Sequence, residues 1–247
     1  MSHPFLSQEL AFYLTPPAPC PYMPGREERK AFTPLNLGTN NPEAVHHLLA
    51  RNGFRRSQMV SYRPACPNCS ACVSVRIPVK DFVYNKRWRR VLARNRDLQR
   101  DPARARATQE RFALFKTYVG QRHADGGMAA MSFSDFRAMI EATPILTVMI
   151  DYYQPRDDGD ERLIASALTD VLGDGLSLVY SFFDPHAQDR SLGSYVILDH
   201  IAIAAQAGLD YVYLGYWVAG SEKMAYKRDF TPLEALVGAD WVRYDPE

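Results

Sequence analysis

Four cysteines, which are all the cysteines of this chain, are the residues whose types and spacing most clearly point to chemistry. Three follow one another as Cys66-x-x-Cys69-x-x-Cys72, and Cys20 lies far upstream in a proline-rich segment. A soft-metal or iron–sulfur site needs about four thiolates. Turn-forming residues between the three clustered cysteines would let the backbone coil around one centre. The spacing therefore predicts one metal site, with Cys20 holding the N-terminal arm to the rest of the domain.

Alternatives to a metal site remain open, and a redox-sensing thiol cluster is the main one. Disulfides are disfavoured, because the first residues lack the basic and apolar regions of a secretory signal and we expect a cytoplasmic protein, whose thiols stay reduced. Zinc and an iron–sulfur cluster are not distinguished. The run has ferredoxin-like spacing, but the x-x-x-Cys-Pro continuation is missing after Cys72.

The net charge of +1 conceals two oppositely charged parts. Residues 51–122 hold 18 Lys and Arg against 4 Asp and Glu, a net charge of +14, whereas the remainder holds 11 against 24, a net charge of −13. The excess predicts a basic surface for a polyanion, and nucleic acid is the favoured partner over an ordinary solvated surface. Apolar runs such as 145–150 are far too short to cross a membrane, so no membrane partner is expected.

The expected elements give an α+β layout that positions these residues. Asn41 and Pro42 begin a helix that Gly53 ends, and the strongly basic helix 85–96 buries Trp88 on one face. An antiparallel meander is expected to lead into a strand–helix–strand unit. The predicted strands are 54–62, 73–78, 145–152, 163–171, 177–183 and 211–214, and the further helices are 105–122, 134–141, 192–207 and 220–227.

Ordered segments along residues 10–235 carry a resemblance to a known family. They are Cys20-Pro21-Tyr22-x-Pro24-Gly25-Arg26, Gly53-Phe54-Arg55-Arg56-Ser57, Tyr62-x-Pro64 with the cysteine run, Asn85-Lys86-x-x-Arg89-Arg90, Ser181-Phe182-Phe183-Asp184-Pro185, Leu214-Gly215-Tyr216-Trp217-Val218-x-Gly220-Ser221-x-Lys223-Met224-x-Tyr226-Lys227 and Phe230-x-Pro232-Leu233-Glu234. These segments resemble the arginyl-tRNA–protein transferases. The triple Cys66, Cys69 and Cys72 resembles the bacterial branch, whereas the eukaryotic enzymes have adjacent cysteines there.

The resemblance implies an activity and a fold. The bacterial branch moves leucine from leucyl-tRNA onto proteins that begin with Asp or Glu, which marks them for degradation by the N-end rule pathway. We therefore expect an N-terminal part, residues 1–104, with the cysteine site and the tRNA-binding region. It would pack on a C-terminal part, residues 105–247, whose fold is acetyltransferase-like (GNAT-type).

The chemistry of such a transfer agrees with the residues present. The tRNA ester is already activated, so neither a covalent nucleophile nor a cofactor is needed. The enzyme must hold amine and ester together, remove a proton and stabilise the oxyanion. The α-amine has a pKa of about 7.7–8.0 and is partly neutral at pH 7. Asp184, His186 and Glu222 are candidates for a general base, and the sequence does not choose among them.

Candidate binding residues form two groups. An acidic acceptor side chain calls for Arg or Lys in a cleft, and an adenosine or leucyl end suits aromatic side chains. The candidates for the acceptor or aminoacyl end are Arg55, Arg56, Arg76, Tyr216, Trp217, Lys223, Tyr226 and Lys227. The candidates for tRNA phosphates are Lys86, Arg87, Arg89, Arg90 and Arg94. Two other functions remain open: an arginyl donor within the same family, and a noncatalytic RNA-binding protein with a structural metal.

Overall fold

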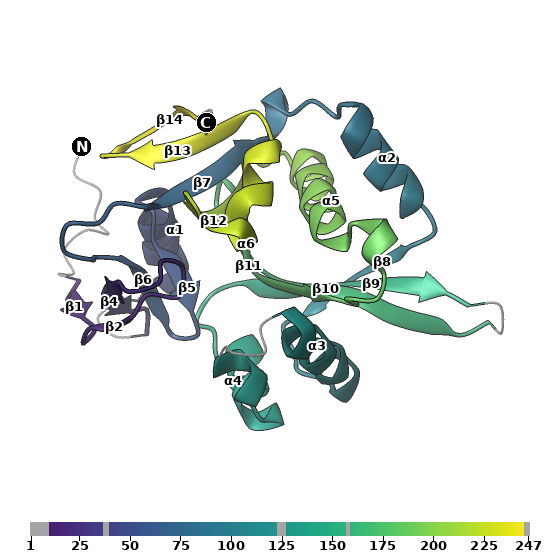
Figure 1. Ribbon diagram of the computed structural model, residues 1–247, viewed down its shortest axis with the longest axis horizontal. Coiled ribbons are helices and arrows are strands. Elements are labelled where there is room, and N and C mark those ends of the chain that lie inside the picture. Colours follow the sequence, from purple (N-terminus) through teal and green to yellow (C-terminus); the bar gives the residue numbers. More distant parts are fainter. Residues whose placement is uncertain (1–9, 37–39, 123–126, 157–158, 245–247) are drawn as a thin grey trace.

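The computed structural model describes residues 10–36, 40–122, 127–156 and 159–244, without the side chains of Glu222 and Lys223. It is a mixed α+β structure, which confirms the expected class, and its centre is an eight-stranded sheet in the order β14-β13-β7-β12-β11-β10-β9-β8 (Figure 1). These strands are β7 (Cys72–Pro78), β8 (Gln99–Arg104), β9 (Thr147–Pro155), β10 (Glu161–Val171), β11 (Gly175–Phe183), β12 (Tyr211–Val218), β13 (Leu233–Val237) and β14 (Asp240–Tyr244).

The expected meander and strand–helix–strand unit are both present. β9, β10 and β11 pair antiparallel in sequence order. The helix α5 (Leu192–Gln206) then returns the chain to β12, which pairs parallel to β11. At the start of β11, a Cβ on Gly175 would collide with the backbone carbonyl of Tyr211, so glycine permits the close approach of these two strands.

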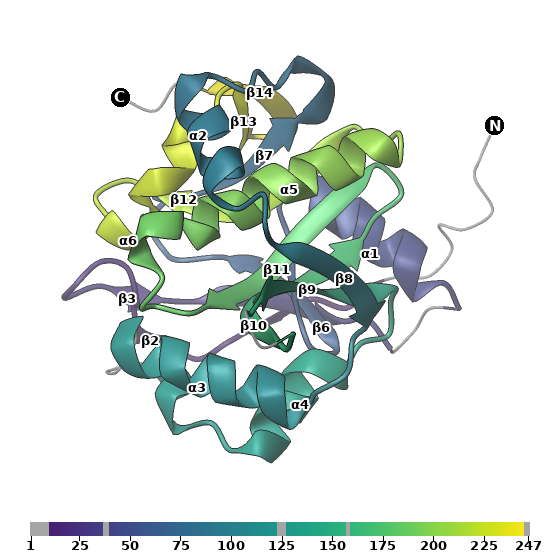
Figure 2. The same cartoon turned by 90° about the vertical axis from the view of Figure 1, so that its right-hand side faces the viewer.

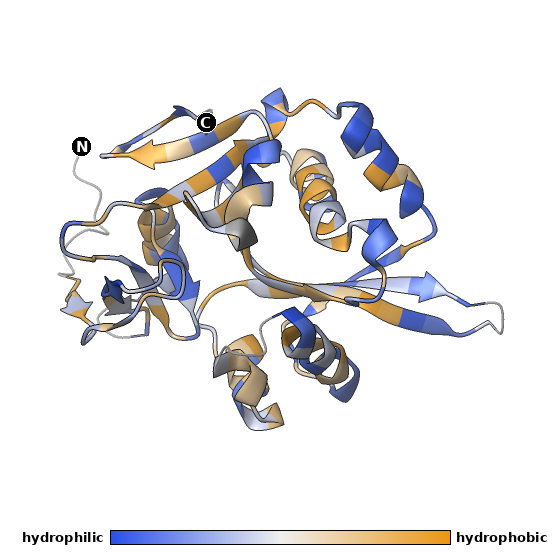
Figure 3. Ribbon diagram, viewed as in Figure 1, coloured by the Kyte–Doolittle hydropathy of each residue, from blue (hydrophilic) through white to orange (hydrophobic). Residues whose placement is uncertain are grey.

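Helices cover both faces of the sheet (Figures 1 and 2). The helices α3 (Gln109–Arg122) and α4 (Phe133–Glu141) pack on one face around Phe115, Phe136 and Phe182. On the other face α5 is largely apolar, whereas α2 (Lys86–Arg94) is mostly hydrophilic (Figure 3). Trp88 of α2 is 1% exposed and stacks on Phe230 with ring centroids 4.5 Å apart, which confirms the expectation that it is a core residue.

A smaller sheet carries the N-terminal residues. Its order is β1 (Tyr13–Leu14), β4 (Lys30–Pro34), β6 (Val60–Pro64) and β5 (Arg55–Ser57), and β2 (Ala18–Pro19) pairs separately with β3 (Glu27–Glu28). The helix α1 (Pro42–Arg51) begins as predicted, because the Asn41 side chain accepts a hydrogen bond from the Ala44 amide at 3.0 Å. The buried ion pair of Arg56 with Asp170 fastens this sheet to β10.

Two expectations about elements were wrong, and one hairpin was missed. The segment 54–62 is the hairpin of β5 and β6 rather than one strand, because Gln58 takes a positive φ of 52° at the turn. Residues 105–108 are not helical, and the edge strand β8 precedes them. Pro102 is tolerated in β8, since an edge strand pairs on one side only. The hairpin of β13 and β14 was not predicted.

Strands from both expected parts of the chain share the large sheet. β7 lies between β12 and β13, and β8 pairs with β9, although both precede residue 105. The two parts expected on either side of residues 104 and 105 therefore both contribute strands to one continuous sheet. No helix in the described ranges is long and apolar enough to span a membrane.

Candidate active site between strands β11 and β12

The two parallel strands at the middle of the large sheet separate after a short pairing. β11 and β12 pair only from Gly175 with Tyr211 to Ser177 with Tyr213, although both strands run on for several residues. Gly215 of β12 has a φ of +74°, and the register with β7 shifts just before it. The backbone groups of β11 and β12 beyond this point need partners other than each other.

Arg55 enters this gap from the small sheet. Its guanidinium donates to the Leu178 carbonyl of β11 and to Ser177 Oγ at 3.4 Å. It also lies against β12, because a Cβ on Gly215 would be 2.8 Å from its Cζ. A guanidinium has five N–H donors, so donors remain for a ligand. Arg55 is thus a positive charge between the separated strands, with a glycine that makes room for it.

Lys227 enters the same region from the opposite side. It lies in the 3₁₀ turn η4 (Tyr226–Asp229), which follows the short helix α6 (Glu222–Ala225) beside β12 (Figure 1). Its Nζ is buried and donates to the carbonyls of Leu214 at 2.8 Å and Tyr216 at 2.7 Å. Burial, and to a smaller extent the positive charge of Arg55, lowers the pKa of Lys227 to about 7.

The hydrogen bonds of Lys227 suit its neutral form. A neutral amine has two N–H groups and one lone pair, and the two carbonyls accept both N–H groups. Neutral Lys227 therefore satisfies its donors and keeps a lone pair that can accept a proton. Together with the fixed charge of Arg55, this gives the gap a proton acceptor and an anion-binding group.

Two other expected cations are paired with carboxylates inside the protein. Arg56 makes two hydrogen bonds of 2.8 and 2.7 Å to Asp170, and both side chains are buried. Arg76 donates to Glu234 at 2.8 Å, and its guanidinium lies 3.5 Å from the ring centroid of Tyr211. Protein carboxylates neutralise these two guanidiniums, whereas the partners of Arg55 are a hydroxyl and a carbonyl. Among the three candidate arginines, Arg55 is therefore the one whose charge is available to a ligand.

The remaining candidates for the acceptor or aminoacyl end lie in different surroundings. The Tyr216 hydroxyl donates to the carbonyls of Gly53 at 2.9 Å and Tyr62 at 3.2 Å. Trp217 is buried in the main core, with its ring centroid 5.7 Å from that of Tyr244. Tyr226 is partly exposed and precedes Lys227 in the turn. The Lys223 side chain lies outside the described residues, so the expectation for it stays a prediction.

All four cysteines line one cavity of about 70 Å³. Cys20 comes from the β2–β3 connection, Cys66 and Cys69 from the β6–β7 loop, and Cys72 from the start of β7. Tyr22, Tyr62 and Tyr216 also line this cavity. The expected convergence of the distant Cys20 on the cysteine run is thus present in the fold, and Tyr216 places the cavity next to the gap between β11 and β12.

The electrostatics of this cavity suit a cation. Burial, followed by the nearby Cys20, Cys66 and Cys69, raises the pKa of the Cys72 thiol to about 11. A hydrogen bond from the Ala71 amide lowers the pKa of the more exposed Cys69. Four crowded thiols fit a soft metal or cluster. No group of three or more His, Cys, Asp or Glu in the described ranges yet has the arrangement of a formed metal site, so the metal stays a prediction.

The basic helix α2 leaves three of its cations open to solvent. Arg87 pairs with Asp229 at 2.8 Å, and Arg94 donates to the Asp189 carbonyl at 3.0 Å. Within the described part of the chain, the exposed side chains of Lys86, Arg89 and Arg90 make no hydrogen bond or ion pair. These three are therefore free to contact phosphates, while Arg87 joins α2 to the turn that carries Lys227.

Two of the three expected general bases, Asp184 and His186, are less suited to proton transfer than Lys227, and the side chain of the third, Glu222, lies outside the described residues. Asp184 is buried, its carboxylate pairs with Arg162, and it accepts a hydrogen bond from the His186 amide at 2.9 Å. His186 itself is exposed, and its Nε2 lies 3.1 Å from the side-chain Nε2 of Gln121.

The sequence contained one signal for the site that was overlooked: Gly215 inside a strand indicates a bulge or a close approach of backbone to another group. Ser177 carried no such signal.

Comparisons with known proteins show the family of this chain. The sequence profile described as the N terminus of arginine-tRNA-protein transferase matches residues 18–90, and that of the C terminus matches residues 110–237. Relatives named aspartate/glutamate leucyltransferase are 53% identical in Phenylobacterium zucineum (98% of this chain, 93% of the relative) and 56% identical in Jannaschia sp. (93% and 79%). Among solved structures the chain is similar to FemX, with a TM-score of 0.47 at 11% identity over 78% of this chain and 64% of FemX. Since the two profiles together span most of the chain, from the cysteine cavity to the turn of Lys227, this chain belongs to the arginine-tRNA-protein transferase family.

Proposed function

We propose that this chain transfers leucine from leucyl-tRNA to the N-terminal α-amine of proteins that begin with Asp or Glu. The observation that carries the proposal is the identity of 53–56% to the leucyltransferase relatives over nearly the whole chain. A cytoplasmic location, where leucyl-tRNA is made, belongs to the same proposal. So do leucyl-tRNA and acidic N-termini as partners, and protein degradation as the outcome.

The proposed reaction is an aminolysis of the tRNA ester. The α-amine nitrogen attacks the leucyl carbonyl carbon, a C–N amide bond forms, and the C–O ester bond to the tRNA ribose breaks. The ribose oxygen leaves with a proton, and the amine gives up one. An acceptor with a pKa near the working pH is best suited to this proton transfer. In the proposal Lys227 accepts it, because its pKa of about 7 lies close to that of the α-amine.

Arg55 supplies the fixed charge in this proposal. Its free N–H donors would bind the side-chain carboxylate of an N-terminal Asp or Glu, and charge-assisted hydrogen bonds of this kind are about twice as strong as neutral ones. The exposed cations Lys86, Arg89 and Arg90 would hold tRNA phosphates. Neither role needs a cofactor. A metal on the four cysteines would supply structural cross-linking of Cys20 to the β6–β7 loop.

Mass spectrometry of modified peptides tests the proposal. Peptides that begin with Asp, Glu or Ala are incubated with the protein and with tRNA charged with leucine or arginine. We expect leucine on the Asp and Glu peptides alone. Arginine on the same peptides would mean that arginyl-tRNA is the donor. If no amino acid is added although tRNA still binds, an RNA-binding function is favoured.

A matched pair of variants tests the role of Arg55. We expect Arg55→Met to lower kcat/KM for the Asp peptide by about tenfold or more, since a hydrogen bond to a charged group contributes about 1.5–3 kcal/mol. Arg63→Met, an exposed arginine on the neighbouring β6, serves as the control. Equal activity of both variants would remove Arg55 from the acceptor site.

A further inference from the structure

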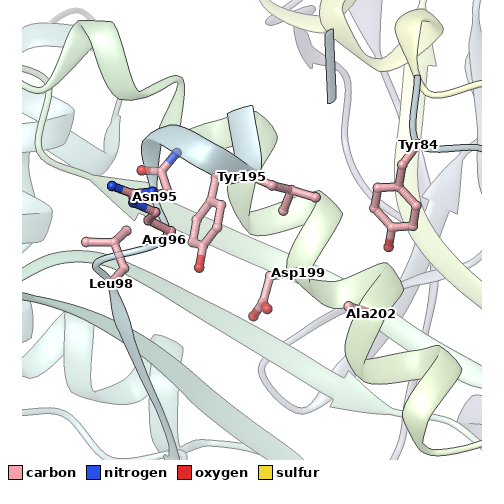
Figure 4. Close-up of a pocket in the computed structure, with 8 residues that line it drawn as sticks. Tyr84, Asn95, Arg96, Leu98, Tyr195, Asp199 and Ala202 are labelled. Atoms are coloured by element: carbon pink, nitrogen blue, oxygen red, sulfur yellow. The ribbon is translucent and has the colours of Figure 1, made fainter. Parts of the chain in front are cut away.

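A second cavity, of about 290 Å³, lies between α2 and α5 (Figure 4). Its lining includes the apolar side chains Leu92, Leu98 and Ala202, the rings of Tyr84 and Tyr195, and the carboxylate of Asp199. Figure 4 shows Tyr195 and Asp199 directed into the same space, with Tyr84 at the other end. A volume near 300 Å³ is at the lower end of the ~300–1,000 Å³ of small-molecule sites.

The carboxylate in this cavity is held in place and has acceptor capacity left. Asp199 Oδ1 accepts from Arg100 at 2.9 Å, and Oδ2 accepts from the Tyr152 hydroxyl at 2.8 Å. A carboxylate offers about four lone-pair sites, so two remain for a ligand. Arg100 balances the charge of Asp199. The cavity therefore suits a flat, neutral ligand with N–H donors on one edge, and a carboxylate there disfavours phosphate.

The surroundings of the cavity are cationic. Arg96 lies at the cavity, and α2, which forms one wall, carries the exposed Lys86, Arg89 and Arg90. Proteins that bind unpaired RNA combine such cations, which follow the backbone, with aromatic side chains that receive unstacked bases. A strand whose phosphates lie along α2 could place one base between α2 and α5.

We propose that this cavity binds one unstacked nucleobase of the tRNA, with the N–H donors of the base on Asp199. Guanine fits best, because its ring N–H and amino group are adjacent and match the two oxygens of a carboxylate. Uracil fits worst, since two of its edge groups are acceptors. This inference rests on the proposed use of tRNA, but it concerns binding and is tested apart from leucine transfer.

Filling the cavity tests the inference without touching a polar group. Ala202 lines the cavity, whereas Ala205 on the same helix is exposed and does not. The affinity for labelled, uncharged tRNA is measured by fluorescence anisotropy at several salt concentrations for Ala202→Phe and for the control Ala205→Phe. We expect Ala202→Phe to weaken binding at least about tenfold, the effect of losing one stacked base, and Ala205→Phe to leave binding unchanged.

The salt dependence separates a base contact from phosphate contacts. A lost base contact leaves the slope of log K against log salt unchanged, whereas each lost phosphate contact lowers it by about 0.7–0.9. Weaker binding of Ala202→Phe at an unchanged slope supports the inference. Unchanged affinity overturns it, and so does a reduced slope, which would mean that the substitution had displaced the phosphate-binding cations.

Competition on the unaltered protein covers the case in which Ala202→Phe does not fold. Guanosine and uridine monophosphates carry the same phosphate and differ in the base. We expect the guanine nucleotide to displace labelled tRNA at a concentration at least about tenfold lower than the uracil nucleotide. Equal competition overturns the inference. Leucine transfer to peptides is followed separately, so failure of the proposed activity would not be mistaken for failure of this site.

Discussion

The depressed pKa of Lys227 predicts how the stability of the protein depends on pH. The unfolded lysine has a pKa of 10.5, and the folded one has a pKa of about 7. Between these values the unfolded chain binds a proton that the folded chain does not, so the free energy of unfolding rises with pH. The slope is about 1.36 kcal/mol per pH unit. From pH 7.5 to 9.5 Lys227 should therefore add about 2.5 kcal/mol.

Urea unfolding at these two pH values measures the effect. Lys227→Met removes the titrating group, so the wild type should gain about 2.5 kcal/mol relative to this variant as the pH rises from 7.5 to 9.5. Two carbonyls lose their donor in the variant, which shifts its stability at both pH values alike and leaves the difference intact. Lys80→Met is the control, since Lys80 is exposed and pairs with Asp210.

The transfer reaction gives an independent readout of the same group. If Lys227 accepts the proton, kcat/KM should fall below pH 7 with the pKa of this lysine, and Lys227→Met should lose both activity and that limb of the pH profile. Parallel stability curves for wild type and Lys227→Met would refute the neutral, buried lysine. If Lys227→Met is still active and its kcat/KM still falls below pH 7 as in the wild type, Lys227 is not the proton acceptor.

The other expectations concern the ion pair, the basic helix and the cysteines. Arg56→Met should lower the free energy of unfolding by about 3–5 kcal/mol, because the buried Asp170 carboxylate loses both hydrogen bonds of the guanidinium and keeps the Thr147 hydroxyl at 2.8 Å and His46 at 3.5 Å. The exposed Arg51→Met should cost less than about 1 kcal/mol; similar losses in urea titrations would contradict this. The triple replacement of Lys86, Arg89 and Arg90 by Ala should reduce the salt slope of tRNA binding by about 2–3, with Arg137→Ala on α4 as control, and an unchanged slope would remove α2 from the tRNA surface. Protein purified without oxygen should contain zinc or iron in proportion to the chain and lose it in Cys72→Ser but not in Ser70→Ala; a metal-free wild type would favour a thiol function.

Elements whose ends carry their own chemical signal were predictable from the sequence. Asn41 and Pro42 mark the start of α1, and Gly53 with a φ of +81° follows its end. The burial of Trp88 follows from helical spacing. β8 and β13 lack such signals, because β8 pairs with the distant β9 and β13 with the distant β7. β14 pairs with its neighbour β13 across Gly238, and this local hairpin was overlooked. The order of the large sheet, in which β7 lies between β12 and β13, was equally unreadable.

The candidate site could be predicted as a set of cations but not as an arrangement. Whether an arginine is available to a ligand depends on carboxylates far away in the sequence. Asp170 is 114 residues from Arg56, and Glu234 is 158 residues from Arg76. No local sequence pattern indicates that these residues pair. The convergence of the cysteines was predictable, because metal-binding thiols have a characteristic spacing even when one ligand is remote.

The adjacent residues Arg55 and Arg56 show why strand register decides function here. Successive side chains of a strand point to opposite faces, so β5 sends Arg55 into the gap between β11 and β12 and Arg56 toward Asp170. A shift of one residue would exchange the two roles. The register is held because Arg56 is buried in its ion pair, whose loss is costly. The charge of Arg55 thus reaches the gap because its neighbour is committed to holding the two sheets together.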